Sequence, residues 1–164
     1  TDEELKKLWK NKDNDIVEMI LIMCYSGYRI KAYESLEVNL KEKFFKGGIK
    51  TAAGKNRIVP IHSAIIPLVE KRLQRDGSML SISTHQFRTK MYRALDALGI
   101  EKHTPHDCRH TFSMLCEKYK VNENDRKRMM GHSFGNDVTN AKYGHRSVEE
   151  LRQEIEKIKI TFCD

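Results

Sequence analysis

Apolar and polar positions follow a helical period along most of the chain. Capping residues and glycines predict where the helices begin and end. The predicted helices begin at Thr1, Asp15, Ser63, Ser83 or Thr84, Thr104, Asn122 and Ser147, and residues 137–143 are expected to form a short turn. Glycines are predicted to end or bend four of these helices, at Gly27, Gly77, Gly99 and Gly131. Two pairs have the spacing of a capping box, Thr1 with Glu4 and Ser147 with Glu150.

The stretch over residues 42–62 breaks this helical pattern. Its sequence, EKFFKGGIKTAAGKNRIVPIH, has short β-type runs separated by Gly-Gly and by Ala-Ala-Gly. Such runs predict a small antiparallel hairpin or three-stranded sheet. We therefore expect a mostly α domain with a small antiparallel β-sheet (α+β), formed as one unit by residues 1–164.

The composition is that of a globular domain, since 39% of the residues are apolar and 32% are charged. No apolar run reaches the length of a membrane span, and no secretory leader is recognisable. The cysteines show no paired framework; they are Cys24, Cys108, Cys116 and Cys163. We expect reduced core thiols in a cytoplasmic protein with no membrane partner.

Positive charge is concentrated in the middle of the chain. Residues 41–132 hold 19 lysines and arginines against 9 aspartates and glutamates, a net charge of +10, whereas the whole chain carries +7. A basic region of this kind is typical of a protein with a polyphosphate partner. It is equally typical of an ordinary soluble basic protein, so charge alone does not decide between the two.

The predicted helix that starts at Thr104 carries an organised polar face. Its helical spacing places His106, Arg109, His110 and Ser113 on one side, and an apolar stripe of Cys108, Phe112, Leu115 and Tyr119 on the other. The polar side is rich in hydrogen-bond donors that suit an anion.

Four further residues carry candidate chemistry, although each also has an ordinary interpretation. Arg29 follows a buried helix and a glycine, and it would otherwise pair with Glu34 or another carboxylate. Lys50 lies between two Gly/Ala-rich turns, where most lysines are simply solvated. His132 follows the helix-ending Gly131, and Tyr143 comes eleven residues later. Taken one at a time, these two are more often incidental or packing residues.

Together these residues occur in the order Arg, Lys, His-x-x-Arg, Gly-His, Tyr, and the chain resembles the tyrosine recombinase (phage integrase) family. The boxes that carry the resemblance are YSGYR, IKTAAGKNRIVPI, TPHDCRHTF, MMGHS and AKYGH, and it extends over residues 1–158. The His-x-x-Arg box is the most specific match. The order and spacing of the boxes are more specific than any one of them.

The resemblance implies site-specific DNA recombination, the integration or excision of a mobile element, through a covalent 3′-phosphotyrosyl intermediate. The implied catalytic residues are Arg29, Lys50, His106, Arg109, His132 and the nucleophile Tyr143. Two arginine forks suit the oxygens of a phosphodiester, and the histidines can donate or move protons near neutral pH. Lys50 would protonate the departing 5′ oxygen. No cofactor and no metal are expected.

The chain departs from the family pattern at two points. Ala32 stands where the family has an acidic residue that orients the first arginine, so support for Arg29 is expected from elsewhere, with Glu34 as one candidate. The spacing from His132 to Tyr143 is about two residues longer than is common in the family.

The resemblance also implies an organisation and partners. The chain is expected to be a catalytic-domain fragment that lacks the family's upstream DNA-clamping domain. Residues 147–164 are expected to form a C-terminal helix and tail, with an apolar stripe, that is either exchanged between subunits or, in the isolated domain, folded back onto its own surface. The expected partner is double-stranded DNA, bound by a homo-tetramer, while the isolated fragment is a monomer or weak oligomer. A bacterial or phage-encoded, nucleoid-associated protein fits this description.

Other interpretations stay open at this point. A non-catalytic DNA-binding relative would keep the basic surface without cutting, and Ala32 and the longer spacing before Tyr143 favour it. Type IB topoisomerases use similar chemistry, but the Gly-His and hairpin context favours the recombinases. A zinc protein that uses His106, Cys108 and His110 is a weaker alternative, because no Cys-x-x-Cys accompanies them.

Overall fold

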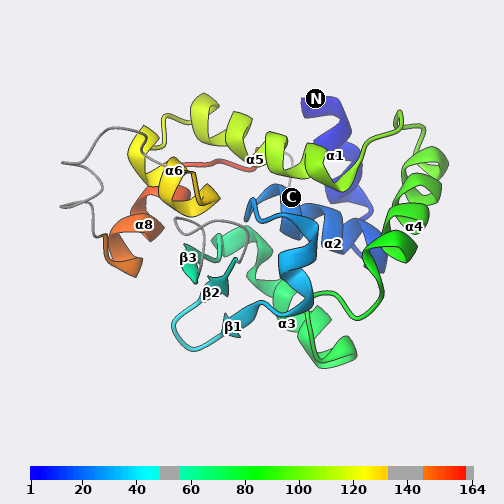
Figure 1. The fold of residues 1–164 in the computed structure, drawn as a ribbon. Coiled ribbons are helices and arrows are strands. Elements are labelled where there is room, and N and C mark those ends of the chain that lie inside the picture. Colours follow the sequence, from blue (N-terminus) through cyan, green and yellow to red (C-terminus); the bar gives the residue numbers. More distant parts are fainter. Residues whose placement is uncertain (49–55, 133–145, 162–164) are drawn as a thin grey trace.

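The protein was analysed as a computed structural model that describes residues 1–48, 56–132 and 146–161. The helices are α1 (Asp2–Lys10), α2 (Asp15–Cys24), α3 (Ile66–Asp76), α4 (Thr84–Ala97), α5 (Pro105–Lys118), α6 (Glu123–Met130) and α8 (Val148–Ile155), with 3₁₀ turns η1 (Ile30–Glu34) and η2 (Ser63–Ile65) (Figure 1). The strands β1 (Glu37–Asn39), β2 (Phe44–Gly47) and β3 (Arg57–Pro60) form an antiparallel sheet in that order. The expected mostly α fold with a small antiparallel sheet is confirmed.

Local sequence signals account for most of the helix ends. Capping boxes start α1, α4, α5 and α8, and Asn122 caps α6 through its side chain. Gly77 and Gly131 end α3 and α6 in the left-handed conformation. Two expectations were inexact: α2 ends at Cys24 rather than at Gly27, and β1 lies ahead of the 42–62 stretch. The turn expected over 137–143 lies outside the described residues.

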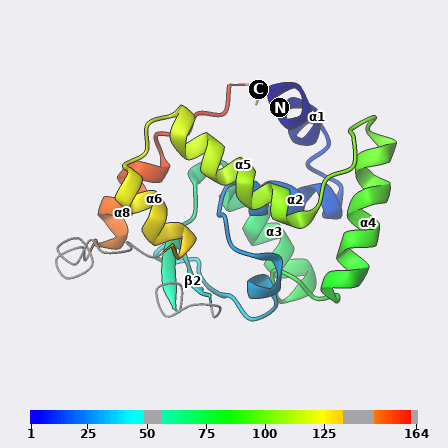
Figure 2. The ribbon, with the colours of Figure 1, turned by 45° about the horizontal axis from the view of Figure 1, so that its top comes forward.

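Helix α2 is the centre of the core. Every residue from Ile16 to Cys24 is buried, and α1, α3, α4 and α5 pack against this helix. Figure 2 shows α5 lying across α2, with α4 at one end of the molecule and α6 and α8 at the other. Cys24, Cys108 and Cys116 are free and buried, as expected for core thiols, while Cys163 lies outside the described residues. None of the described helices is long and apolar enough to cross a membrane.

Helix α8 packs against β3 of its own chain. Its apolar stripe enters the common core, because Leu151, Ile155 and Ile158 are all buried. The carbonyl oxygen of Ile158 also lies 2.8 Å from Nε2 of His62, ahead of η2. The described part of the 147–164 segment therefore closes the core of the chain that carries it, and its exchange between subunits stays a prediction.

Candidate anion-binding site

Three segments far apart in the sequence meet at the side chain of Arg109. This residue lies on α5 and is only 3% exposed. Its Nη1 donates to the carbonyl oxygen of Gly27 at 2.6 Å, and its Nη2 donates to that of Met130 at 2.7 Å. Arg109 thus connects the middle of α5 to the turn after α2 and to the end of α6.

The close approach of the α2 turn to α5 depends on Gly27. Its φ is +77°, and a Cβ atom there would lie 2.3 Å from Cδ1 of Phe112. A larger residue would both strain the backbone and clash with the ring. Glycine therefore allows the turn to sit against α5, and Arg29 follows two residues later.

Arg29 is half-buried and is presented by a turn that the tyrosine of η1 holds. The hydroxyl of Tyr33 accepts a hydrogen bond from the backbone N–H of Tyr28 at 3.2 Å and also contacts Oγ of Ser26. Glu34 is exposed, and within the described residues no carboxylate pairs with Arg29. The suggested pairing with Glu34 is wrong, since η1 directs the acidic residue to solvent while Tyr33 fixes the turn.

The polar face predicted for α5 is divided in the structure. His106 and His110 are exposed and in contact, with ring centroids 4.7 Å apart. Arg109 instead lies on the buried side with Cys108 and Phe112, because its long side chain reaches the carbonyl groups of neighbouring segments. Partial desolvation, followed by the charges of His110, Arg109 and Arg29, lowers the pKa of His106.

His132 is placed by the left-handed turn that ends α6. Gly131 has a φ of +72°, and the N–H of His132 donates to the carbonyl oxygen of Lys127 at 2.8 Å, as in a Schellman motif. Partial burial lowers the pKa of His132, and the charges of Arg109 and Arg126 lower it further. The imidazole is therefore neutral at pH 7 and shares an electrostatic environment with the arginine cluster.

Arg57 belongs to the same cluster, although the sequence analysis did not single it out. Its Nε donates to the carbonyl oxygen of Met129 at 2.8 Å, and its guanidinium lies 4.4 Å from the centre of the Tyr28 ring. Arg57 and Arg109 thus bind consecutive carbonyl groups just ahead of Gly131 and His132. The strand period was the available signal, because it places Arg57 on the buried face with Val59.

The cluster of cations is strong enough to perturb its own members. Burial lowers the pKa of Arg109 to about 10, and the nearby charges of Arg29 and Arg57 contribute to this shift. Among the described residues, the hydrogen-bond partners of Arg109 are two neutral carbonyl groups rather than carboxylates. Arg109 remains charged at neutral pH, so the site favours an added anion.

Two of the predicted site residues, Lys50 and Tyr143, lie outside the described residues. Three other tyrosines are accounted for by packing, because Tyr25, Tyr28 and Tyr33 are fully buried. Burial raises the pKa of Tyr28 and of Tyr33, which opposes formation of a phenolate at either. These three are poor candidates for a nucleophile.

The alternative prediction of a zinc site at His106, Cys108 and His110 is wrong, because the two histidines face solvent while Cys108 points into the core. A hydrogen bond with Cys24, together with burial, raises the pKa of the Cys108 thiol and keeps it protonated. Metal ligation requires the thiolate.

Arginines and histidines from four separate segments come together in this mostly helical domain. The fold and the site therefore define a class of protein, a helical domain with a cationic centre. The chain belongs to the phage integrase family, because the sequence model described as "Phage integrase family" matches residues 1–150. These proteins are the tyrosine recombinases, so the resemblance seen in the sequence is confirmed at the level of the family.

The fold is similar to that of a solved structure, the integrase from mycobacterium phage Brujita. The TM-score is 0.71 at 15% sequence identity, and the match covers 97% of this chain and 57% of the phage protein. At that identity the likeness shows the fold alone, and the chain spans little more than half of the phage integrase. No curated protein matches the chain in sequence.

Proposed function

We propose that the chain is the catalytic domain of a site-specific recombinase that cuts and rejoins double-stranded DNA. Membership of the phage integrase family supports this proposal. The observation that carries it is the cluster of Arg29 and Arg109, to which the described residues supply no carboxylate counter-charge. A DNA phosphate is an anion whose size and charge suit such a cluster.

In this proposal the arginines bind the phosphate that is cut. A guanidinium has five N–H groups, and two of those on Arg109 are used by the carbonyl groups of Gly27 and Met130. The others remain for non-bridging phosphate oxygens, whose charge grows as phosphorus becomes five-coordinate. Arg29, whose charge lowers the pKa of Arg109, adds a second charged fork. Stabilisation that increases toward the transition state is what accelerates the reaction.

In the proposed reaction, the side chains of the site supply the nucleophile and every proton donor and acceptor. Tyr143 gives its phenol proton to a neutral histidine of the site and its oxygen attacks phosphorus, the bond from phosphorus to the 5′ oxygen breaks, and Lys50 gives that oxygen a proton. His106 and His132, neutral at pH 7, accept or donate protons at the phosphate. A free 5′-hydroxyl from another strand reverses the step without ATP, because the phosphotyrosyl bond conserves the energy of the phosphodiester.

The full reaction includes assembly. We expect four copies of the full protein to act on two DNA duplexes in the bacterial cytoplasm, with the 147–164 segment exchanged between neighbours. In the structure the described part of that segment packs on its own chain. Exchange would transfer the buried contacts of α8 from one chain to the next.

The test is covalent trapping on a nicked suicide substrate in the presence of EDTA. The cations of the site supply the charge that a nuclease metal would supply, so the adduct is expected to form in chelator at the same rate. Loss of the adduct in EDTA and its return with Mg²⁺ would contradict the mechanism. Tight DNA binding without any adduct from the full-length protein would favour the non-catalytic relative.

A further inference from the structure

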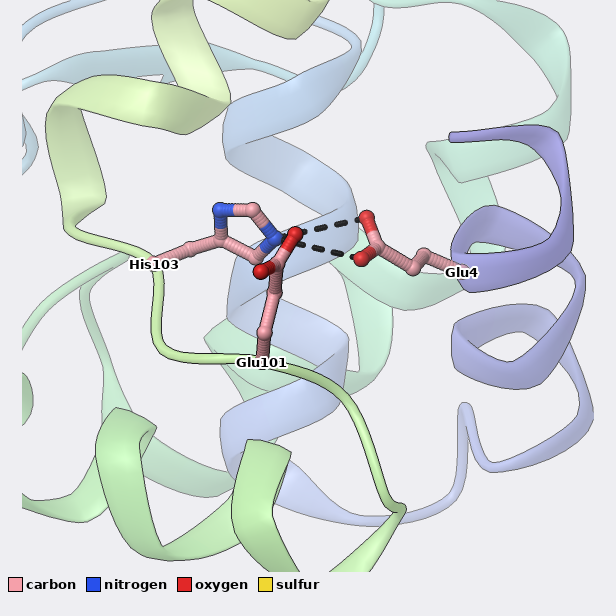
Figure 3. A group of neighbouring side chains, drawn as sticks. All are labelled: Glu4, Glu101 and His103. Carbon is pink, nitrogen blue, oxygen red and sulfur yellow. Dashed lines mark hydrogen bonds and ion pairs between the residues drawn. The ribbon is translucent and has the colours of Figure 1, made fainter.

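Two carboxylates and an imidazole from separate parts of the chain meet beside the start of α5 (Figure 3). Glu4 lies in the first turn of α1, whereas Glu101 and His103 lie in the segment between α4 and α5. One ligand atom from each residue lies within 4.8 Å of those of the other two. Within the described residues this is the one group of three or more side chains with the composition and spacing to hold a metal ion.

Two of the three donor atoms already have the separation that a tetrahedral metal ion requires. Nε2 of His103 lies 3.3 Å from each carboxylate oxygen of Glu4; Oε2 also accepts a hydrogen bond from the Thr1 ammonium group at 3.0 Å, which leaves Oε1 as the donor to an ion. Bonds of 2.0–2.1 Å to a tetrahedral zinc place neighbouring donors about 3.4 Å apart. Glu101 is exposed, so its side chain is free to rotate, and its donor atom lies within 4.8 Å of those of Glu4 and His103.

The other ring nitrogen of His103 provides an independent observation that points to a metal. Nδ1 lies 3.4 Å from Oδ2 of Asp107, and that carboxylate is itself fixed by the backbone N–H of Thr104 at 2.9 Å. Metal-binding histidines commonly donate their second N–H to a carboxylate, which fixes the tautomer and aims the free nitrogen at the ion. Asp107 thus orients Nε2 toward Glu4 and Glu101.

From this arrangement we propose that Glu4, Glu101 and His103 bind a divalent transition-metal ion of the zinc class. Two carboxylates and a neutral imidazole carry the charge that neutralises a divalent cation. The nitrogen donor favours Zn²⁺ over Mg²⁺ or Ca²⁺, which prefer oxygen ligands alone. The ion links α1 to the segment that leads into α5, and the proposal is independent of any reaction on DNA. EDTA would also remove this ion and so lower the folding stability of the chain. The EDTA test described under the proposed function is therefore run well below the unfolding temperature.

The experiment measures Zn²⁺ binding to the metal-free chain by calorimetry and by the thermal unfolding midpoint, Tm. One equivalent of Zn²⁺ is expected to bind, and Tm is expected to rise by on the order of 5 °C at a concentration one hundred times the Kd. MgCl₂ at the same concentration is expected to leave Tm unchanged. Glu101→Gln and His103→Gln each remove a ligand and are expected to weaken Zn²⁺ binding at least about tenfold. Asp107→Asn, which keeps an acceptor for the Thr104 N–H, is expected to weaken binding by about 10–100-fold.

The matched control is His110→Gln, because His106 and His110 form a second exposed pair one helical turn apart. The proposal expects this variant to bind Zn²⁺ like the parent. Binding that survives in both Glu101→Gln and His103→Gln, or that is lost in His110→Gln, would overturn it. So would a chain whose Tm does not respond to Zn²⁺, since His103 would then serve only as an ion-pair partner of Glu4 and Asp107.

Discussion

The guanidinium of Arg109 donates a hydrogen bond of 2.7 Å to the carbonyl oxygen of Met130, the last residue of α6. His132 follows two residues later, after the left-handed Gly131. The same guanidinium holds the carbonyl oxygen of Gly27, two residues ahead of Arg29. The side chain proposed to bind phosphate therefore also fixes the segments that carry two other members of the site.

Arg109→Lys tests this double role. Lysine keeps the positive charge, but a single ammonium group does not reproduce the fork that binds Gly27 and Met130. We expect a loss of about 1–3 kcal/mol in the free energy of unfolding, because a buried carbonyl group loses its partner. Adduct formation is expected to fall far more than DNA affinity, and the salt slope of binding is expected to stay near that of the parent because lysine keeps the charge. Binding that collapses while the bound fraction cuts normally would make Arg109 a docking residue.

Arg57→Lys separates positioning from phosphate binding. Arg57 binds Met129 from β3 and stacks on Tyr28, so its loss is expected to shift the end of α6 and with it His132. We expect adduct formation to slow by about 10–100-fold, the cost of misplacing a reacting group. DNA affinity and its salt slope are expected to match the parent. A reduced salt slope would instead show that Arg57 itself contacts a phosphate.

DNA binding is expected to strengthen as the pH falls from 8 toward 6. Partial desolvation and neighbouring cationic side chains, arginines in both cases and His110 for His106, lower the pKa values of His106 and His132 in the free chain. A bound phosphate offsets the arginine charges and raises both values, so the complex holds more protons than the free chain and lower pH favours it. Calorimetry in two buffers of different ionisation enthalpy measures this uptake. His132→Asn is expected to reduce it, whereas His85→Gln, on the exposed surface of α4, is expected to leave it unchanged. Equal proton uptake by the parent, His132→Asn and His85→Gln would contradict the assignment of His132 to the phosphate-binding site.

The core contains a buried ion pair that stability measurements can isolate. Glu18 is fully buried on α2, and Nη1 of Arg72, which is 3% exposed, lies 3.1 Å from its Oε1. Arg72→Met removes the buried cationic partner of this carboxylate. The variant is expected to lose about 3–5 kcal/mol in the free energy of unfolding, measured with urea. Arg75 contacts the same oxygen at 2.9 Å but is 37% exposed, so Arg75→Met is expected to cost about 1 kcal/mol or less. Equal costs for the two variants would show that burial does not set the strength of this pair.

Local signals allowed the helices to be predicted, but they did not reveal how the side chains of the site meet. The Ser147–Glu150 box and the glycine after Met130 act within one turn, so the sequence shows them directly. The bonds of Arg109 to Gly27 and of Arg57 to Met129 span 82 and 72 residues. No period or cap encodes such a contact, which is why the helical spacing groups Arg109 with the polar face of α5 and why Arg57 was missed.

The family order of residues identified Arg29, His106, Arg109 and His132 as a set, and in the structure the charges of Arg29 and Arg109 help to lower the pKa values of His106 and His132. Physical reasoning on each residue alone favoured an incidental role. For Arg29, that reasoning assumed a carboxylate partner nearby, whereas the fold supplies a tyrosine-held turn and a second arginine.

The most direct test of the proposed function is covalent adduct formation by Tyr143→Phe on a nicked suicide substrate. Phenylalanine removes only the hydroxyl group, so the variant is expected to fold and to bind DNA like the parent. Tyr119→Phe is the control, because Tyr119 is a partly buried residue at the end of α5 that packs against the core. In a denaturing gel the account predicts an adduct for the full-length parent and for Tyr119→Phe, and none for Tyr143→Phe. An adduct formed by Tyr143→Phe would place the nucleophile elsewhere and contradict the account.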